Sequence, residues 1–276
     1  MSSAVIELKN LTFRYADGTR ALDNIDLSLP YGARVAFLGS NGAGKSTLFS
    51  ILNGVLKPSG GEYFRNGKLQ KFDRKSLFEL RKEVGVVFQE PDNQIFSANV
   101  YEEVSFGPMN LKLPADEVHR RVQKSLADTG VEEFSHKPAH LLSYGQKKRV
   151  TIASVLSMEP SVLVLDEPAS GLDPQHSNEI VELLTALNHQ GKTILMSTHN
   201  VNLAYAWADW LVVMHKGTVL ASGNPLELFK DKVLMRNAGL DIPVVLEVYE
   251  RISRFFPERE VPVSKPELLK MLEELS

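Results

Sequence analysis

The spacing of apolar residues near the start of the chain predicts β-strands. Val5–Leu8 and Leu22–Leu29 alternate apolar and polar residues, and Asp17-Gly18 between them is typical of a turn. Ala33–Leu38 is a nearly continuous apolar run, which indicates a strand buried on both faces. A glycine-rich loop follows, and a helical pattern then extends over Lys45–Asn53.

Three more buried strands are expected further along the chain. Val84–Phe88, Val162–Leu165 and Thr193–Ser197 are runs of aliphatic or β-branched residues. A helical pattern around Glu179–His189 separates the last two runs and completes a strand–helix–strand unit. The pattern therefore predicts an α/β fold.

Two segments are predicted to be mainly helical. Residues from about 92 to 158 include Ala115–Gly130, whose apolar positions recur about every 3.6 residues. Residues 226–276 have helical patterns without a strong strand signal, and we interpret them as a small C-terminal helical extension of a domain at 1–225. These patterns are interrupted at Gly239, Pro243, Pro257, Pro262 and Pro266.

Composition and charge narrow the functional class. The 276 residues include 43% hydrophobic and 24% charged residues and no cysteine, which is typical of a globular protein that needs no disulfides. The net charge is −3 without any block of Lys or Arg, so a dedicated nucleic-acid binder is not expected. The apolar runs are much shorter than the roughly 20 residues that span a bilayer. A function at a membrane would therefore require a separate anchoring subunit.

The glycine-rich loop predicts a phosphate site. Residues 39–46, GSNGAGKS, match the pattern G-x-x-x-x-G-K-[ST] between a buried strand and a helix start. Backbone N–H groups of such a loop curl around phosphates, and the helix N-terminus adds its positive dipole. We expect Lys45 to reach the β- and γ-phosphates of ATP and Ser46 to bind Mg²⁺. The candidate nucleotide-binding residues are Gly39, Ser40, Asn41, Gly42, Ala43, Gly44, Lys45, Ser46 and Thr47. The alternative is a glycine-rich turn that only caps a helix.

Two adjacent acidic residues follow the strand at Val162–Leu165. Asp166 is a candidate ligand of the Mg²⁺ shell, directly or through water. Glu167 is a candidate general base that accepts a proton from the attacking water. The alternative is an acidic turn after a buried strand.

With these residues, the chain resembles the nucleotide-binding subunit of an ABC transporter over roughly residues 5–225. Five further motifs follow the order found in that family. They are the aromatic residue Tyr15, the Q-loop glutamine Gln89, the signature Leu142–Gln146, the D-loop Ser170–Asp173 and the switch histidine His199. The resemblance implies a P-loop ABC-type nucleotide-binding domain, with a mixed-sheet core, a helical subdomain at about 92–158, and ATPase activity.

The resemblance also assigns roles to these residues. It implies that two chains hold two ATP molecules head to tail, so that Ser143, Gly145 and Gln146 of one chain contact the γ-phosphate bound to the other. His199 is expected at the γ-phosphate, and Gln89 is expected to join Mg²⁺ and the water to the helical subdomain. Tyr15 is expected to stack on adenine, with Phe13 as a competitor, and Asp173 of the D-loop is expected among the nucleotide-binding residues. Simple N-capping of a helix by Ser143 is the alternative for the signature.

Finer resemblances point to one branch of the family. Gln89–Phe96 is similar to a stretch of energy-coupling-factor transporters, and LSYGQKKRV at 142–150 is closest to their cobalt-type, CbiO-like ATPases. In such systems, an ATPase pair on the cytoplasmic face of the cell membrane grips coupling helices of a membrane T-component, and a separate S-component captures the substrate. Asp92 is then a candidate partner for an arginine of the T-component. Its alternative is a solvated loop acid.

Several alternatives stay open from the sequence. The transported substrate could instead be nickel, biotin or another vitamin, and the partner ATPase an identical chain or a paralogue. A soluble ABC ATPase acting on ribosomes or DNA is disfavoured by the single P-loop, and a non-hydrolysing subunit by Glu167 and His199. Two departures from the family pattern are Tyr144, in place of a glycine, and Ala169, in place of a threonine or serine. Apolar residues of the extension are candidates for a permanent dimer contact: Ile242, Val245, Val248, Tyr249 and Ile252.

Overall fold

The computed structural model describes residues 4–256 and 259–274. Its centre is a six-stranded sheet in which the strands are parallel except for β10, which is antiparallel to β9. In spatial order the strands are β10 (Thr218–Gly223), β9 (Trp210–His215), β3 (Arg34–Leu38), β8 (Thr193–Thr198), β7 (Val162–Leu165) and β6 (Val84–Val87). All residues of β7 and β8 are buried, as expected for apolar strands covered on both faces.

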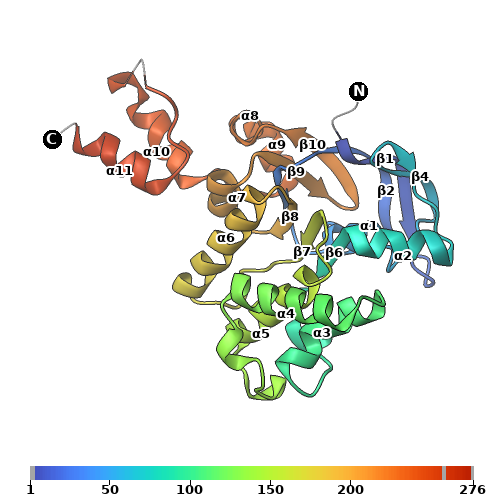
Figure 1. The fold of residues 1–276 in the computed structure, drawn as a ribbon. Coiled ribbons are helices and arrows are strands. Elements are labelled where there is room, and N and C mark those ends of the chain that lie inside the picture. The colour runs from blue at the N-terminus through green and yellow to red at the C-terminus, as the bar shows by residue number, and fades with distance from the viewer. Residues whose placement is uncertain (1–3, 257–258, 275–276) are drawn as a thin grey trace.

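A four-stranded antiparallel sheet packs beside the first one (Figure 1). Its strands, in spatial order, are β2 (Arg20–Pro30), β1 (Ala4–Arg14), β4 (Gly60–Arg65) and β5 (Lys68–Leu69). The β1 strand is longer than the predicted Val5–Leu8. The prediction ended too early because irregularities in the pairing of β1 with β2 interrupt the alternation of apolar residues. The mixed sheet core predicted from the family resemblance is thus present.

Consecutive residues of β3 divide the core between two faces. Val35 and Phe37 pack in one cluster with helix α1 (Lys45–Leu52), and Ala36 and Leu38 pack in another with helix α7 (Val201–Trp207). This is the two-residue period of a strand. A third cluster lies under helix α6 (Pro174–His189), which covers β7 and β8.

A helical lobe lies below the sheets in Figure 1. It consists of α3 (Val100–Asn110), α4 (Ala115–Thr129) and α5 (Tyr144–Leu156), packed around their own apolar cluster. Helix α5 also packs against the β6–β7 side of the central sheet. These three helices lie between residues 100 and 156. None of the helices in the described ranges is both long enough and apolar enough to cross a bilayer.

Two helices escaped the sequence analysis, α2 (Arg74–Glu83) and α7. Helix α2 buries only Leu80, and its ten residues include just three apolar ones, which are too few to distinguish it from a polar loop. Its start is set by Asp73, whose side chain accepts hydrogen bonds from the N–H groups of Lys75 and Ser76. Helix α7 has seven residues, too few for a periodic pattern to be recognised.

The residues after 225 form helices α8 (Pro225–Lys230), α9 (Lys232–Ala238), α10 (Val244–Ile252) and α11 (Lys265–Glu273). Gly239 ends α9 with a φ of 67°, and Pro243 precedes α10, as the predicted breaks require. Pro266 is the second residue of α11 rather than an interruption of a helix, since proline is tolerated in a first turn. Pro257 lies outside the described residues.

Only part of this extension projects from the domain. Figure 1 shows α10 and α11 at the upper left, whereas α8 and α9 lie against β9 and β10. Phe229 of α8 and Met235 of α9 are fully buried in the same cluster as Ala36 and Leu38 of β3. The apolar residues Ile242, Val245, Val248 and Ile252 also pack into this cluster, so they cover the chain's own core.

Replacing Phe229 with alanine tests whether α8 belongs to the core. The side chain is fully buried and its ring meets Tyr205 edge to face at 5.7 Å. The cavity should lower the free energy of unfolding by about 3–5 kcal/mol, measured by urea denaturation. The control is Val233→Ala at a side chain that is mostly exposed. A loss as small as that of the control would show that α8 is an appendage.

Candidate functional site

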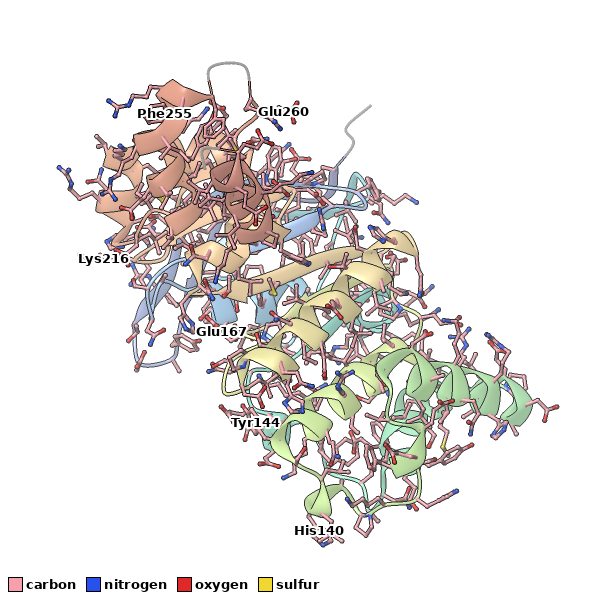
Figure 2. All side chains as sticks on the ribbon, turned by 90° about the vertical axis from the view of Figure 1, so that its left-hand side faces the viewer. His140, Tyr144, Glu167, Lys216, Phe255 and Glu260 are labelled. Carbon is pink, nitrogen blue, oxygen red and sulfur yellow. The ribbon has the colours of Figure 1, made fainter. Side chains whose placement is uncertain are left out.

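The predicted site residues follow the carboxyl ends of adjacent parallel strands. β3 leads into the P-loop, β7 into Asp166 and Glu167, β8 into His199, and β6 into Gln89. Because these strands pair in parallel, all four segments lie at one edge of the sheet. Figure 2 shows Glu167 between the β9–β10 turn at Lys216 and the start of α5 at Tyr144.

The P-loop conformation depends on glycine at Gly44, the residue before α1. Its φ is 100°, and a Cβ atom there would lie 2.9 Å from the Ala21 carbonyl oxygen and 2.8 Å from the Leu22 side chain. Ser40, Asn41, Gly42 and Ser46 are exposed, whereas Gly39, Ala43, Lys45 and Thr47 are buried. The loop thus exposes part of its backbone and the Ser46 hydroxyl at the start of a helix, as an anion site requires.

Lys45 folds back over this loop. Its ammonium group donates hydrogen bonds to the carbonyl oxygens of Gly39 at 2.6 Å and Ser40 at 3.3 Å. Burial lowers the pKa of Lys45, and the carboxylates of Glu167 and Asp166 oppose that shift. The lysine and the two acidic residues therefore share one electrostatic environment.

A serine that the sequence analysis did not single out joins the two acidic residues. Ser197 Oγ donates to Asp166 Oδ1 at 2.5 Å and accepts the Glu167 backbone N–H at 2.8 Å. Asp166 is buried, and Glu167 has a φ of 46° in the left-handed region. Non-glycine residues are uncommon there and are often found at functional sites. The serine belongs to β8, so only a parallel pairing with β7 could have revealed its role.

The side chains of Glu167 and His199 meet. His199 Nδ1 lies 3.0 Å from Glu167 Oε2, and the imidazole is mostly exposed whereas the carboxylate is mostly buried. A carboxylate held beside an imidazole can accept a proton from a water molecule that the imidazole orients. The structure thus brings together two of the predicted catalytic residues.

In the segment after β6, the side chain of Gln94 bonds back to the end of the strand. Gln89 is exposed, two residues after the last residue of this strand. The side chain of Gln94 turns back and accepts the Phe88 N–H at 3.0 Å. Asp92 is not simply solvated, because its carboxylate lies 2.6 Å from the ammonium group of Lys147 on α5.

The signature residues form the N-terminus of α5. Ser143 accepts the Gln146 N–H at 3.3 Å and Gln146 Oε1 accepts the Ser143 N–H at 2.9 Å, which is a capping box. Within one chain, Ser143 therefore acts as the N-cap of α5, which is the alternative given above for the signature. Tyr144 is the first helical residue, as expected for a position that tolerates a side chain. Its ring packs on Gly171, where a Cβ atom would lie only 3.0 Å from the ring.

Asp173 and Tyr15 lie at two other parts of the site. Asp173 caps α6 by accepting the His176 N–H at 3.0 Å, and its carboxylate lies 2.6 Å from His176 Nδ1. Tyr15 is partly exposed, and its hydroxyl lies 2.9 Å from Thr47 Oγ1 next to the P-loop. Phe13 is buried, so it is not available for stacking on a ligand.

The oxygen atoms of two residues at this site suit Mg²⁺ as ligands. Ser46 and Asp166 offer a hydroxyl and a carboxylate, which a hard cation prefers. Among the described residues, no group of three or more His, Asp or Glu is arranged to hold a metal ion.

Comparisons with known proteins agree with this geometry. The ABC transporter family matches residues 22–170. The energy-coupling factor transporter ATP-binding protein EcfA of Methanocaldococcus jannaschii is 50% identical over 91% of this chain and 90% of its own length. Two other relatives are longer, a putative ABC transporter ATP-binding protein of Methanosarcina mazei and EcfA2 of Methanospirillum hungatei, and the chain spans 60% and 63% of them.

Two solved structures are similar. That of cbiO1 from Clostridium perfringens, described as part of the ABC transporter complex cbiONQ, has a TM-score of 0.77 and 45% identity over 90% of this chain and 99% of that one. A dimeric ATP-binding cassette bound to ADP and Pi has a TM-score of 0.72 and 30% identity over 80% of this chain and 98% of that one. The chain therefore belongs to the ABC transporter family, as an ABC-type ATPase and an ATP-binding subunit of the energy-coupling factor class.

Proposed function

We propose that this chain hydrolyses ATP in a site shared by two ATPase subunits, and thereby powers import of cobalt ions at the cytoplasmic face of the membrane. The observation that supports hydrolysis best is the 3.0 Å contact between Glu167 Oε2 and His199 Nδ1. In this proposal Glu167 is the general base, and His199 orients the attacking water beside the γ-phosphate.

The P-loop would bind the phosphates of ATP. Lys45 must leave the carbonyl oxygens of Gly39 and Ser40 to reach the β- and γ-phosphates, and the charge of ATP would compensate this loss. Ser46 and Asp166 would hold Mg²⁺, with Gln89 contacting its shell. The bound ion would neutralise negative charge on the phosphate oxygens.

The adenine would stack on Tyr15. The exposed face of this ring and its link to Thr47 support the choice over buried Phe13. Stacking of a base on an aromatic ring contributes about 1–3 kcal/mol.

The second half of the site would come from a partner ATPase, either an identical chain or a paralogue. Within the described residues, no hydrogen bond joins Ser143, Gly145 or Gln146 to the P-loop of the same chain, and Figure 1 places α5 and α1 in different lobes. The N-terminus of α5 is thus available for the γ-phosphate bound to the partner. Asp173, at the N-terminus of α6, would lie at the same interface.

The membrane partner would bind in a groove between α2 and the helical lobe. The groove has a volume of about 920 Å³, and Phe78, Phe96 and Phe106 expose large apolar surfaces in its wall. The rings of Phe96 and Phe106 meet edge to face with centroids 4.7 Å apart, so they support each other in the apolar wall of the groove. We propose that a coupling helix of the T-component lies here, and that the S-component is contacted indirectly.

The choice of cobalt is supported by two likenesses. The signature LSYGQKKRV resembles that of cobalt-type ATPases, and the similar structure is of cbiO1 in a cbiONQ complex. The ATPase does not contact the transported ion in this proposal, so other substrates are tested with the whole complex.

Glu167→Gln should lower ATP turnover by about 10²–10⁴-fold, because the amide cannot accept the proton. Phosphate release measures the turnover, and light scattering should detect dimers trapped with ATP. The control is Glu132→Gln, an exposed carboxylate of the helical lobe. Near-normal turnover of Glu167→Gln would contradict the assignment of the base.

Asp92→Ala should weaken assembly with the T-component by about two- to fivefold, as expected for loss of an exposed ion pair. Asp92 lies two residues before Gln94, which lines the groove. Titration of the purified ATPase against the T-component in detergent measures the affinity, and Asp116→Ala, another exposed acid, is the control. An affinity equal to that of the control would contradict the proposed contact.

Uptake by the intact complex tests the substrate. Proteoliposomes with the co-purified subunits should accumulate radioactive cobalt when ATP is supplied on the ATPase side. Complexes with Glu167→Gln should not. Accumulation of nickel or of a vitamin such as biotin in place of cobalt would contradict the cobalt assignment while leaving the ATPase role intact.

A further inference from the structure

A buried lysine of the helical lobe reaches the backbone of the proposed base. We propose that Lys148 is a positioning residue, which places Glu167 for catalysis only when helix α5 is docked against the end of β7. This inference rests on the proposed role of Glu167.

The contact is well defined. Lys148 is 3% exposed, and its ammonium group donates a hydrogen bond to the Glu167 carbonyl oxygen at 2.9 Å. The same ammonium group lies 5.3 Å from the centre of the Tyr144 ring. A lysine is rarely buried unless its charge is compensated, so the position has to be explained by these partners.

The charge of Lys148 is retained in this environment. Burial lowers its pKa to about 8, and the carboxylates of Glu90, Glu167 and Asp166 counteract that shift. The ammonium form is therefore still the major one at neutral pH and can donate to the carbonyl.

The peptide turn at Glu167 has three other bonds, and none of them involves the helical lobe. Its N–H bonds to Ser197 of β8, its side chain meets His199, and its carbonyl oxygen also accepts the N–H of Ser170 at 3.1 Å. These partners belong to the sheet or to the turn itself. In the described part of the chain, Lys148 is the only helical-lobe residue hydrogen-bonded to Asp166 or Glu167.

The position of Lys148 on α5 connects this bond to the signature. Lys148 lies five residues after Ser143, so about 7 Å of continuous helix separates the two. A helix transmits displacement as a rigid rod, and a shift of α5 would move the ammonium group relative to the carbonyl. If Ser143 contacted a phosphate and α5 shifted, Lys148 would thus move the peptide of Glu167.

The experiment compares Lys148→Met with Lys192→Met in the full-length chain. Lys192 is a matched control, because its ammonium group also donates to a backbone carbonyl, that of Pro160 at 2.8 Å, and burial also lowers its pKa. Steady-state phosphate release gives kcat and KM, and a fluorescent ATP analogue gives the nucleotide affinity.

Lys148→Met should lower kcat by about 10- to 100-fold, the range expected when a catalytic group is slightly misplaced. KM and the affinity for the analogue should stay close to the wild-type values, since no phosphate contact is removed. Lys192→Met should leave all three unchanged. Hydrogen exchange of the amides at 167–171 should become faster only in Lys148→Met, which tests the position of the turn independently of activity.

A double variant separates the possible outcomes. Adding Lys148→Met to Glu167→Gln should cause no further loss, because a positioning residue acts through the residue it positions. A normal kcat for Lys148→Met beside an inactive Glu167→Gln would overturn the positioning role and leave the proposed function intact. A raised KM, or a full further loss in the double variant, would also overturn it. Normal turnover in Glu167→Gln would instead overturn the proposed function itself.

Discussion

The site depends on how the peptide of Glu167 is held. A glutamate with a φ of 46° is strained by about 1–3 kcal/mol, and it persists only where its surroundings fix it. Ser197 fixes the N–H side and also bonds to Asp166, so the proposed metal ligand and the proposed base share one anchor on β8. Lys148 bonds to the carbonyl side from another lobe. The geometry of one peptide thus depends on the sheet and on the helical lobe together.

The sequence predicts best what is encoded locally. The P-loop could be recognised because its glycines and Lys45 are adjacent in the chain and follow an apolar strand. The central strands were correct to within a residue or two, because a strand buried on both faces is a continuous apolar run. The capping box at Ser143 and Gln146 is equally local. Each of these features is complete within about ten residues.

Other features arise from contacts between distant residues, and no local pattern shows them. Ser197 lies about 30 residues from its acidic partners, and Asp92 lies 55 residues from Lys147. The proposed boundary at residue 225 followed a change in pattern, yet Phe229 completes a cluster that includes β3. A helix that supplies one buried ring to a distant strand cannot be distinguished in sequence from a separate appendage.

The β9–β10 turn joins the two sheets beside the nucleotide site. Gly217 N–H bonds to the carbonyl of Ala43, its own carbonyl accepts the N–H of Asp23, and a Cβ atom at Gly217 would lie 2.7 Å from the Ala21 carbonyl oxygen. The P-loop and strand β2 are therefore connected through hydrogen bonds to a single residue of this turn. A movement of the P-loop relative to the antiparallel sheet would therefore have to break one of these two hydrogen bonds of Gly217.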